Sequence, residues 1–232
     1  FLNVISIFSF IGISLGVAVL IIVMSVMNGF RTELINKIVG FNAHITVKPY
    51  ETEINKSNKS NLDLISKNLI FSNSGEGIII KKDLSKGIVL RGYDINDFSK
   101  LEIIKNKNFI GNKNNLKKDS ISIGKELSFN LDLKIGDTVT IMSSTGLDTI
   151  IGTLPKQKTF TVGSLFESGL ADFDKNVAFI NLKTLEEFFN LEPKNRILEI
   201  YLINPQKIEN QKKIVQKLFP NEFVYSWSDM NS

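Results

Sequence analysis

Residues 4–27, VISIFSFIGISLGVAVLIIVMSVM, decide how the rest of this chain is interpreted. They contain no charged side chain, and residues 1–30 as a whole contain none either. As a helix, residues 4–27 would extend about 36 Å, which exceeds the roughly 30 Å hydrocarbon core of a bilayer. The stretch is too long for a secretory signal peptide and lacks the basic flank of one. A buried core helix of this length would normally carry a polar side, so a membrane span is predicted.

The helical pattern continues beyond the span. Apolar residues recur at helical spacing up to Ile38, with polar residues between them, and Gly40 is a typical helix end. We therefore expect a membrane helix with a stalk over residues 1–40 and a second domain over residues 41–232. The pattern leaves open whether the stalk transmits movement or only extends the span.

Small residues share one face of the predicted span. Ser9, Gly12 and Gly16 lie at helical spacing, and Gly12 and Gly16 form the small-xxx-small pattern that lets two helices approach closely in lipid. The face therefore predicts a helical neighbour, and membrane lipids around the rest of the span.

The charged residues all follow the span. They comprise 28 basic and 24 acidic side chains, and only three of the basic ones are arginine. Because arginine is the preferred reader of phosphates and bases, nucleic-acid binding is not predicted. The absence of cysteine excludes disulfides and thiol chemistry and suits an oxidising compartment.

The pattern after residue 41 alternates between strands and helices, which predicts the fold class α+β on a membrane anchor. A polar stretch at residues 50–61 is expected to be a surface linker, turns are expected at residues 73–75 and 83–86, and residues 143–158 are expected to form a long loop. The strands are predicted at residues 43–49, 77–81, 87–93, 138–142, 159–166, 176–180, 198–203 and 222–225, and the main helices at 97–104, 182–190 and 205–218.

No constellation of residues predicts catalysis or a metal site. His44 is the only histidine and has no partners at recognisable spacing, so it is interpreted as an ordinary strand residue. Gly124-Lys125 resembles the end of a phosphate loop, but position 119, where the first glycine is required, is Asp119. The acidic pairs Asp172/Asp174 and Glu186/Glu187 are interpreted as solvated faces.

Five segments together resemble the LolC/LolE lipoprotein-releasing permeases of Gram-negative bacteria. They are residues 12–34 (GISLGVAVLIIVMSVMNGFRTEL), 88–94 (IVLRGYD), 123–139 (IGKELSFNLDLKIGDTV), 160–174 (FTVGSLFESGLADFD) and 226–231 (SWSDMN). The resemblance covers nearly the whole chain. Single pieces of it also occur in the wider group of MacB/FtsX-type permeases.

The resemblance implies a four-span protein of the bacterial inner membrane, with a large periplasmic domain of two subdomains, a MacB-like periplasmic core, between spans one and two. This chain would then be span one with that domain, ending before transmembrane helix 2. The resemblance also implies a second LolC/LolE-type permease subunit, a LolD-like cytoplasmic ATPase, lipoprotein cargo and a LolA-like periplasmic carrier. It implies no cofactor and no enzymatic activity of the permease itself.

The same resemblance assigns roles to particular residues. The family's carrier-binding hook falls on residues 143–158, with a flanking pad, and the lipoprotein cavity would be near the periplasmic end of the span. Two positions depart from the family pattern, because Ile150 stands where proline is frequent and Thr140 where arginine is frequent. The residues implied are Ile150, Ile151, Gly152, Leu154 and Pro155 in the hook, Gln157 and Lys158 in the pad, and Met27 and Phe30 at the cavity.

Two alternatives stay open at this point. One is a MacB/FtsX-type permease that drives efflux or activates a cell-wall hydrolase, and the other is a membrane-anchored periplasmic enzyme. Within the LolC/LolE reading, the long loop resembles the LolC branch, and a single protein serving both roles as a homodimer is also compatible with the sequence.

Overall fold

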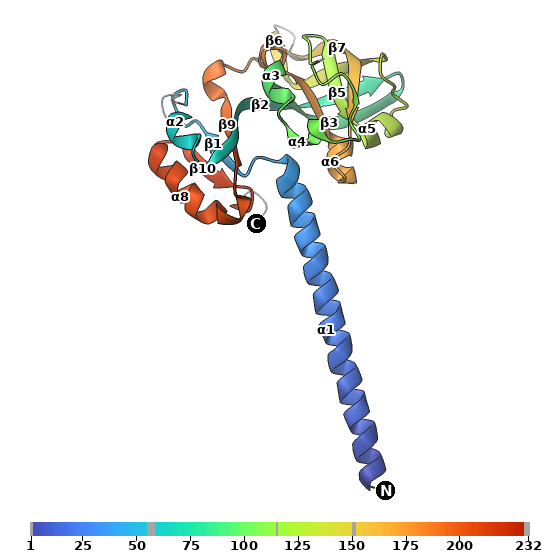
Figure 1. Ribbon diagram of the computed structural model, residues 1–232. Helices are drawn as coiled ribbons and strands as arrows, with labels where there is room; N and C mark the ends of the chain where they lie inside the picture. The colour runs from blue at the N-terminus through green and yellow to red at the C-terminus, as the bar shows by residue number, and fades with distance from the viewer. Residues whose placement is uncertain (1, 55–58, 115, 150–151, 230–232) are drawn as a thin grey trace. The chain divides into compact units, whose positions relative to one another are not determined.

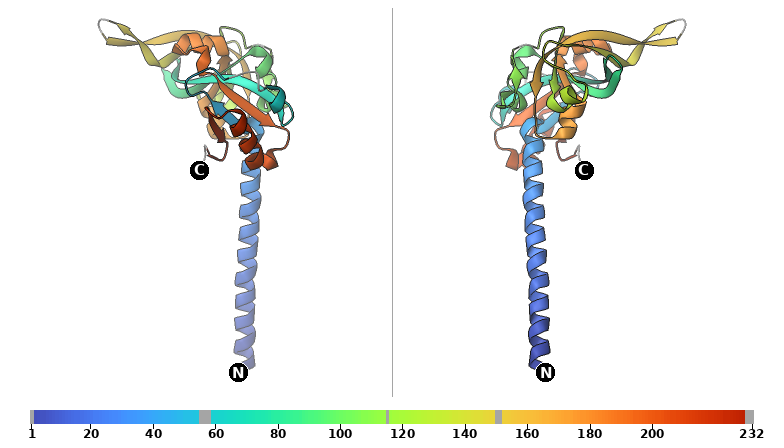
Figure 2. Two further views of the ribbon diagram at one scale, coloured as in Figure 1. Left: turned by 90° about the vertical axis from the view of Figure 1, so that its left-hand side faces the viewer. Right: turned by 90° about the vertical axis from the view of Figure 1, so that its right-hand side faces the viewer.

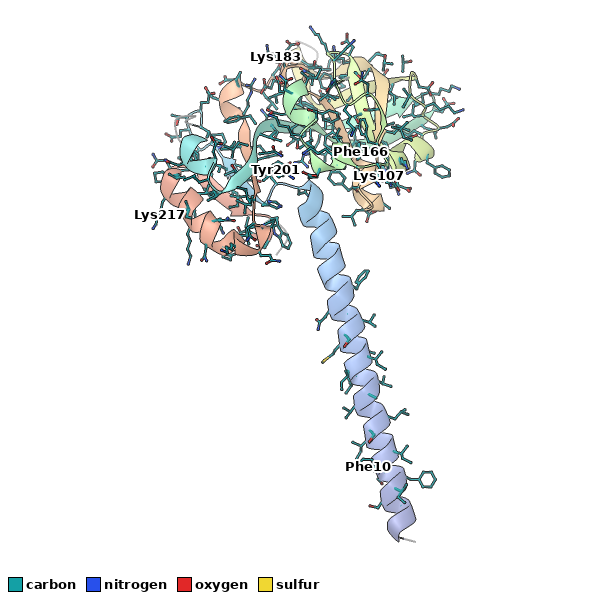
Figure 3. All side chains as sticks on the ribbon, viewed as in Figure 1. Phe10, Lys107, Phe166, Lys183, Tyr201 and Lys217 are labelled. Atoms are coloured by element: carbon teal, nitrogen blue, oxygen red, sulfur yellow. The ribbon has the colours of Figure 1, made fainter. Side chains whose placement is uncertain are left out.

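The computed structural model describes residues 2–54, 59–114, 116–149 and 152–229. The chain divides into two compact units, Phe1–Ile38 and Val39–Ser232. The first unit consists of helix α1, which runs from Leu2 to Phe41 (Figure 1). Within the described residues, Ile5–Phe30 is the one helical stretch long and apolar enough to cross a membrane, with a mean hydropathy of 2.8. Its apolar side chains, Phe10 among them, stand out from the helix without burial (Figure 3).

The second unit contains two subdomains that share one strand. The smaller subdomain is an antiparallel sheet in the order β10-β1-β9-β2. Alternate residues of β1 and β9 pack in one buried cluster with Val215 of helix α8 and with Phe219, which directly follows that helix. The elements are β1 (Ile45–Lys48), β2 (Ser66–Lys81), β9 (Ile197–Leu202), α8 (Ile208–Leu218) and β10 (Phe223–Ser226).

The larger subdomain is a closed barrel. Its strands pair in the order β2-β3-β8-β5-β7-β6, and β6 pairs again with β2, so the ring has no open edge. Inward residues such as Ile79, Ile123, Ile141 and Val162 fill the interior and are fully buried. The strands are β3 (Leu84–Tyr93), β5 (Ser120–Gly124), β6 (Thr138–Thr149), β7 (Gly152–Phe166) and β8 (Val177–Asn181), with β4 (Ile110–Gly111) beside β7.

Short helices cover the barrel and the junction between the subdomains. Helix α7 packs on β2 and β3, and a third buried cluster, which includes Phe166 and Tyr201, fills the junction. The remaining elements are α2 (Lys59–Leu62), α3 (Ile95–Phe98), α4 (Glu102–Lys105), α5 (Lys125–Asn130), α6 (Ala171–Asn176), α7 (Leu182–Phe189) and the 3-10 turns Pro193–Asn195 and Pro205–Lys207.

The turn predicted at residues 73–75 is wrong, because β2 passes through it without interruption. Gly75 is needed there for packing: a Cβ atom at this position would lie 2.6 Å from the ring of Phe189 in α7. Gly92 on the paired strand has the same role beneath Leu185. The single helix predicted at residues 97–104 is also wrong, since α3 ends at Phe98 and α4 begins at Glu102. The α+β class with a mixed domain of two subdomains is confirmed.

Candidate partner-binding arm and helix face

The segment predicted as a long loop at residues 143–158 is a β-hairpin arm. Strands β6 and β7 pair beyond the barrel, from Gly146↔Pro155 out to Thr149↔Gly152. Figure 2 shows this hairpin extending away from the rest of the second unit. The loop prediction fails because pairing satisfies backbone N–H and C=O groups that a loop of this length would leave to solvent. We call residues 143–158 the arm.

An irregularity in β6 marks the point where the arm leaves the barrel. Met142 pairs with Gln157 and Gly146 with Pro155, so three residues of β6 lie opposite a single residue of β7. Ser143, the first of the three, is still paired with Gly77 of β2. Extra residues on one strand bend the pair and increase its twist, which directs the outer arm away from the barrel wall.

The predicted hook residues lie on this arm, as far as the structure describes them. Leu154 is 53% exposed and Pro155 is also exposed. Gly152, the first residue of β7, has a φ of 119°, a backbone conformation that strongly favours glycine. Ile150 and Ile151, the predicted tip, lie outside the described residues.

The two predicted pad residues differ in their surroundings. Gln157 is exposed, and its Nε2 lies 3.8 Å from the Sδ atom of Met142. Lys158 is half-buried, because its Nζ pairs with Asp119 at 2.8 Å and lies 5.6 Å from the ring centre of Phe160. The hydrogen bond from Lys158 lowers the pKa of the Asp119 carboxyl. Of the pad, Gln157 is therefore the side chain directed to solvent.

Lys156 also holds the arm against helix α7, and no sequence pattern indicated this residue. Lys156 donates to the side chain of Asn190 and, at 3.4 Å, to the carbonyl of Glu187. Asn190 caps α7 in the left-handed conformation, which asparagine tolerates well. The signal available in the sequence was this asparagine at a helix end, but only the fold brings it beside β7.

The residues predicted on the span fall on one face of α1. At about 100° per residue, Ser9, Gly12, Gly16, Met27 and Phe30 lie within a narrow stripe along the helix. Met27 and Phe30 are 61% and 60% exposed. A Cβ atom at Gly12 or Gly16 would meet no described atom of this chain within 4 Å.

The histidine and the glycine-lysine pair weighed for chemistry have structural surroundings. His44 Nδ1 accepts a hydrogen bond of 2.7 Å from the backbone N–H of Leu202. A Cβ atom at Gly124 would overlap the backbone of Asp174, so glycine here allows α6 to pack closely against the start of α5. The adjacent Lys125 pairs with Glu167.

The acidic pairs are not solvated faces throughout, contrary to the sequence analysis. Asp174 is buried and its two oxygens accept from the backbone N–H of Ser168 at 2.9 and 3.1 Å; burial raises the pKa of this carboxyl. Glu186 is buried and binds Arg196 through two hydrogen bonds of 2.6 and 2.7 Å. Among the described residues, no group of three or more His, Asp or Glu side chains is placed to hold a metal ion.

Comparison with known proteins identifies the family. The model of the MacB-like periplasmic core domain matches residues 6–217 of this chain. The solved structures to which this chain is similar include the periplasmic region of MacB from Actinobacillus actinomycetemcomitans, with 10% identity, a TM-score of 0.45 and coverage of 84% of this chain and 94% of that one. The extracellular domain of the ABC-type transporter YknZ has 11% identity, a TM-score of 0.45 and coverage of 78% of this chain and 100% of that one.

Curated relatives carry the name "Lipoprotein-releasing system transmembrane protein LolC". The protein from Xylella fastidiosa strain Temecula1 is 28% identical over 83% of this chain and 48% of its own length. The protein from Neisseria meningitidis serogroup B is 26% identical over 100% of this chain and 58% of its own length. The one from Buchnera aphidicola subsp. Schizaphis graminum is 29% identical over 98% and 57%. The chain spans about half the length of the curated relatives it matches.

These findings define the class of protein, since a membrane helix leads into a mixed α/β domain and the family model covers most of the chain. The chain belongs to the family of MacB-like periplasmic core domains. Its relatives named LolC place it with the LolC/LolE-type permeases of the MacB/FtsX superfamily.

Proposed function

We propose that the complete protein is the membrane subunit of an ABC transporter that extracts lipoproteins from the inner membrane and transfers them to a LolA-like periplasmic carrier. The names of its relatives support this role, as does the family to which the periplasmic domain belongs. In this proposal the protein is multi-pass, its large domain lies in the periplasm, and a second LolC/LolE-type subunit completes a hetero- or homodimer.

A separate LolD-like ATPase supplies the energy in this proposal, so the permease itself is not an enzyme. The glycine-lysine pair of the described chain supports this division, because Gly124 packs against Asp174 and Lys125 binds Glu167. A phosphate loop needs backbone N–H groups and a lysine that are free to bind phosphate.

The observation that carries the proposal is the exposed arm. Leu154 and Pro155 lie on a two-stranded hairpin beyond the barrel, where few neighbours are available to cover them. Full burial of a leucine side chain contributes about 1.5 to 3 kcal/mol, so a partner that covers this surface gains affinity. A periplasmic carrier is the partner that the resemblance to LolC/LolE permeases implies, and Gln157 would be a polar contact at the rim.

The stripe on α1 has two roles in the same proposal. Ser9, Gly12 and Gly16 allow close packing against another membrane helix. Met27 and Phe30 follow on the same face, where larger side chains hold the neighbour farther away. We propose that the acyl chains of lipoprotein cargo contact these two residues as they leave the membrane.

The test is an arm deletion in the full-length protein. Replacing residues 143–156 by Asn-Gly connects Met142 to Gln157 through a two-residue turn. These two residues already pair across the hairpin. The domain is expected to stay folded, because loop length has a small effect on stability, while binding to an immobilised LolA-like carrier is lost.

A pair of point variants controls this experiment. Leu154→Ser changes the arm, and Leu84→Ser changes a leucine of similar exposure, 49%, at the end of the other hairpin of the barrel. Only Leu154→Ser is expected to weaken carrier binding. Unchanged binding by the folded deletion variant, or equal losses from both serine variants, would contradict the proposal.

A further inference from the structure

Strand β3 extends beyond the strand beside it. Its residues 89–93 pair with β8, but among the described residues no strand lies beside residues 84–88 on that side. On its other side, β3 pairs with β2 along its whole length. An unpaired strand edge presents backbone N–H and C=O groups that can pair with another extended segment. We call residues 84–88 the free edge of β3.

One face of the free edge is hollow. Gly87 lies opposite Ile78 of β2, and a Cβ atom at Gly87 would meet no described atom of this chain within 4 Å. The hollow has a volume of about 340 Å³ and extends to Asn176, which directly precedes β8. Ile78 and Val89 at its wall are each 37% exposed. Apolar side chains of a bound segment therefore have room on this face.

The opposite face carries a lysine whose ammonium group has no partner. Lys86 pairs with Ile79, a fully buried core residue, so the two side chains lie on the same face of the sheet. The Nζ atom of Lys86 is buried and has no hydrogen-bond partner among the described residues. Buried polar atoms in proteins are usually hydrogen-bonded, because a buried group without a partner is unfavourable. Since this ammonium group has no hydrogen bond to lose, it can turn toward a ligand.

The charges near Lys86 favour an acidic ligand. Burial and the neighbouring Lys175 of α6 lower the pKa of Lys86, while Asp172 has a smaller, opposite effect. The surroundings therefore disfavour the positive charge, and a carboxylate beside the ammonium group would stabilise it. A hydrogen bond between two charged groups is also stronger than one between neutral groups.

We propose that the free edge of β3 binds an extended segment of a partner protein in which apolar and acidic residues alternate. Side chains of a strand point alternately to opposite faces. When the backbone of the segment pairs with the free edge, its apolar residues enter the hollow at Gly87 and its acidic residues reach Lys86. Strand addition of this kind derives affinity from backbone hydrogen bonds and specificity from alternate side chains.

Charge also favours an acidic partner over a second copy of this chain. The chain carries a formal net charge of +4, so two copies repel each other at long range. The free edge lies outside the arm, so this binding does not depend on a carrier.

The test measures the binding of two short labelled peptides to the full-length protein by fluorescence anisotropy. Both peptides alternate valine with a charged residue, which is glutamate in one and lysine in the other. The glutamate peptide is expected to bind at least about tenfold more tightly, because only its side chains complement Lys86. The lysine peptide controls for apolar contacts and for backbone pairing, and this comparison needs no variant.

Matched variants test the two faces separately. Lys86→Gln should weaken binding of the glutamate peptide at least about fivefold, whereas Lys82→Gln, which removes an exposed lysine from the turn of the same hairpin, should change it less than about twofold. Gly87→Val places a side chain in the hollow, where its Cβ atom has open space, and should also weaken binding at least about fivefold. Thermal unfolding near the parent temperature shows that each variant is folded.

Hydrogen exchange shows where the glutamate peptide binds. Amides within residues 84–88 should become protected on binding, and the arm should exchange as before. No binding of the glutamate peptide, equal binding of both peptides, equal losses from Lys86→Gln and Lys82→Gln, or unchanged exchange at residues 84–88 would overturn the proposal. A change in the oligomeric mass of the detergent-solubilised protein in Lys86→Gln, measured by light scattering without peptide, would assign the edge to a second copy and would also overturn it.

Discussion

The barrel contains two long hairpins, β2–β3 and β6–β7, and only β6–β7 continues beyond the barrel wall. The β2–β3 hairpin keeps a regular register from Ser72↔Tyr93 to Lys81↔Leu84. The β6–β7 hairpin changes register after Met142 and continues beyond the barrel. Both are rich in strand-forming residues. The difference lies in their neighbours: residues 77–80 of β2, next to the turn, lie between β3 and β6, whereas the outer arm has only its own two strands.

Each hairpin also has one lysine–aspartate ion pair, which we call its brace, so the two hairpins do not differ in this contact. Lys81 of β2 pairs with Asp137 at 3.1 Å, and Lys158 of β7 pairs with Asp119 at 2.8 Å. The β2–β3 hairpin has core contacts in addition to its brace, since Ile79 and Ile88 are buried in the barrel. The described outer arm has no member in the three buried clusters. We therefore expect β2–β3 to support stability and the arm to support carrier binding.

The largest expected effect separates the two hairpins by stability. Ile79→Ala removes a fully buried side chain from the barrel and should lower the free energy of unfolding by about 3 kcal/mol. The arm deletion described above should change it by less than about 1 kcal/mol. Urea unfolding of both variants measures this difference. Equal destabilisation would mean that the arm is part of the folding unit.

The next effect separates the hairpins by affinity. Leu154→Ser should weaken carrier binding about tenfold, which corresponds to about 1.4 kcal/mol, because it removes apolar area that the partner would cover. Leu84→Ser should leave the affinity unchanged. Titration of the full-length protein with the carrier gives both values, and a larger loss from Leu84→Ser would reverse the assignment of the two hairpins.

A smaller effect concerns the rigidity of the arm. The double substitution Lys156→Ala and Lys158→Ala removes the contacts with Asn190 and Asp119. Stability should change by less than about 1 kcal/mol, since ion pairs near the surface contribute little. Hydrogen exchange of the β6–β7 amides beyond Met142 should become faster, while Lys81→Ala should leave the β2–β3 amides protected. Unchanged exchange in the arm would show that pairing alone holds it.

The smallest effect is the pH dependence of the two braces. Lys158 lowers the pKa of Asp119, and the backbone N–H of Lys134 followed by Lys81 lowers that of Asp137, each from an ordinary value of 3.8. A carboxyl with a lowered folded-state pKa stabilises the fold above its unfolded value, and this contribution is lost as the pH falls through the folded value. Below about pH 4, exchange in the arm should therefore accelerate after correction for intrinsic rates. The β2–β3 hairpin should remain protected by its core contacts.

Much of the architecture follows from local patterns. The membrane helix is predicted by an uncharged stretch longer than a bilayer core, and α1 covers it. Alternation predicts the strands near residues 45–48, 197–202 and 223–226, and helical spacing predicts α7.

The wrong predictions, the turn at residues 73–75 and the loop at residues 143–158, concern residues whose structure depends on contacts with segments distant in the sequence. Gly75 lies inside β2, where Phe189 of α7 packs against it, although the segment Asn73-Ser74-Gly75 has the composition of a turn. The arm was predicted as a loop because Gly146, Gly152 and Pro155 interrupt its alternation. Its strand character depends on pairing between two segments, and periodicity within either segment does not report pairing.

The sequence by itself determined that this chain has a membrane helix, an α+β domain and no recognisable catalytic motif, because these depend on composition and on periods of two or 3.6 residues. Only the tertiary structure decided that six strands close into a barrel, that the described residues of the arm form a paired hairpin, and that Arg91 contacts both Asn42 and Glu199. Contacts such as Arg91 with Glu199 join residues that are 108 positions apart. No local pattern encodes them, because their free energy arises only when the intervening chain has folded and excluded water.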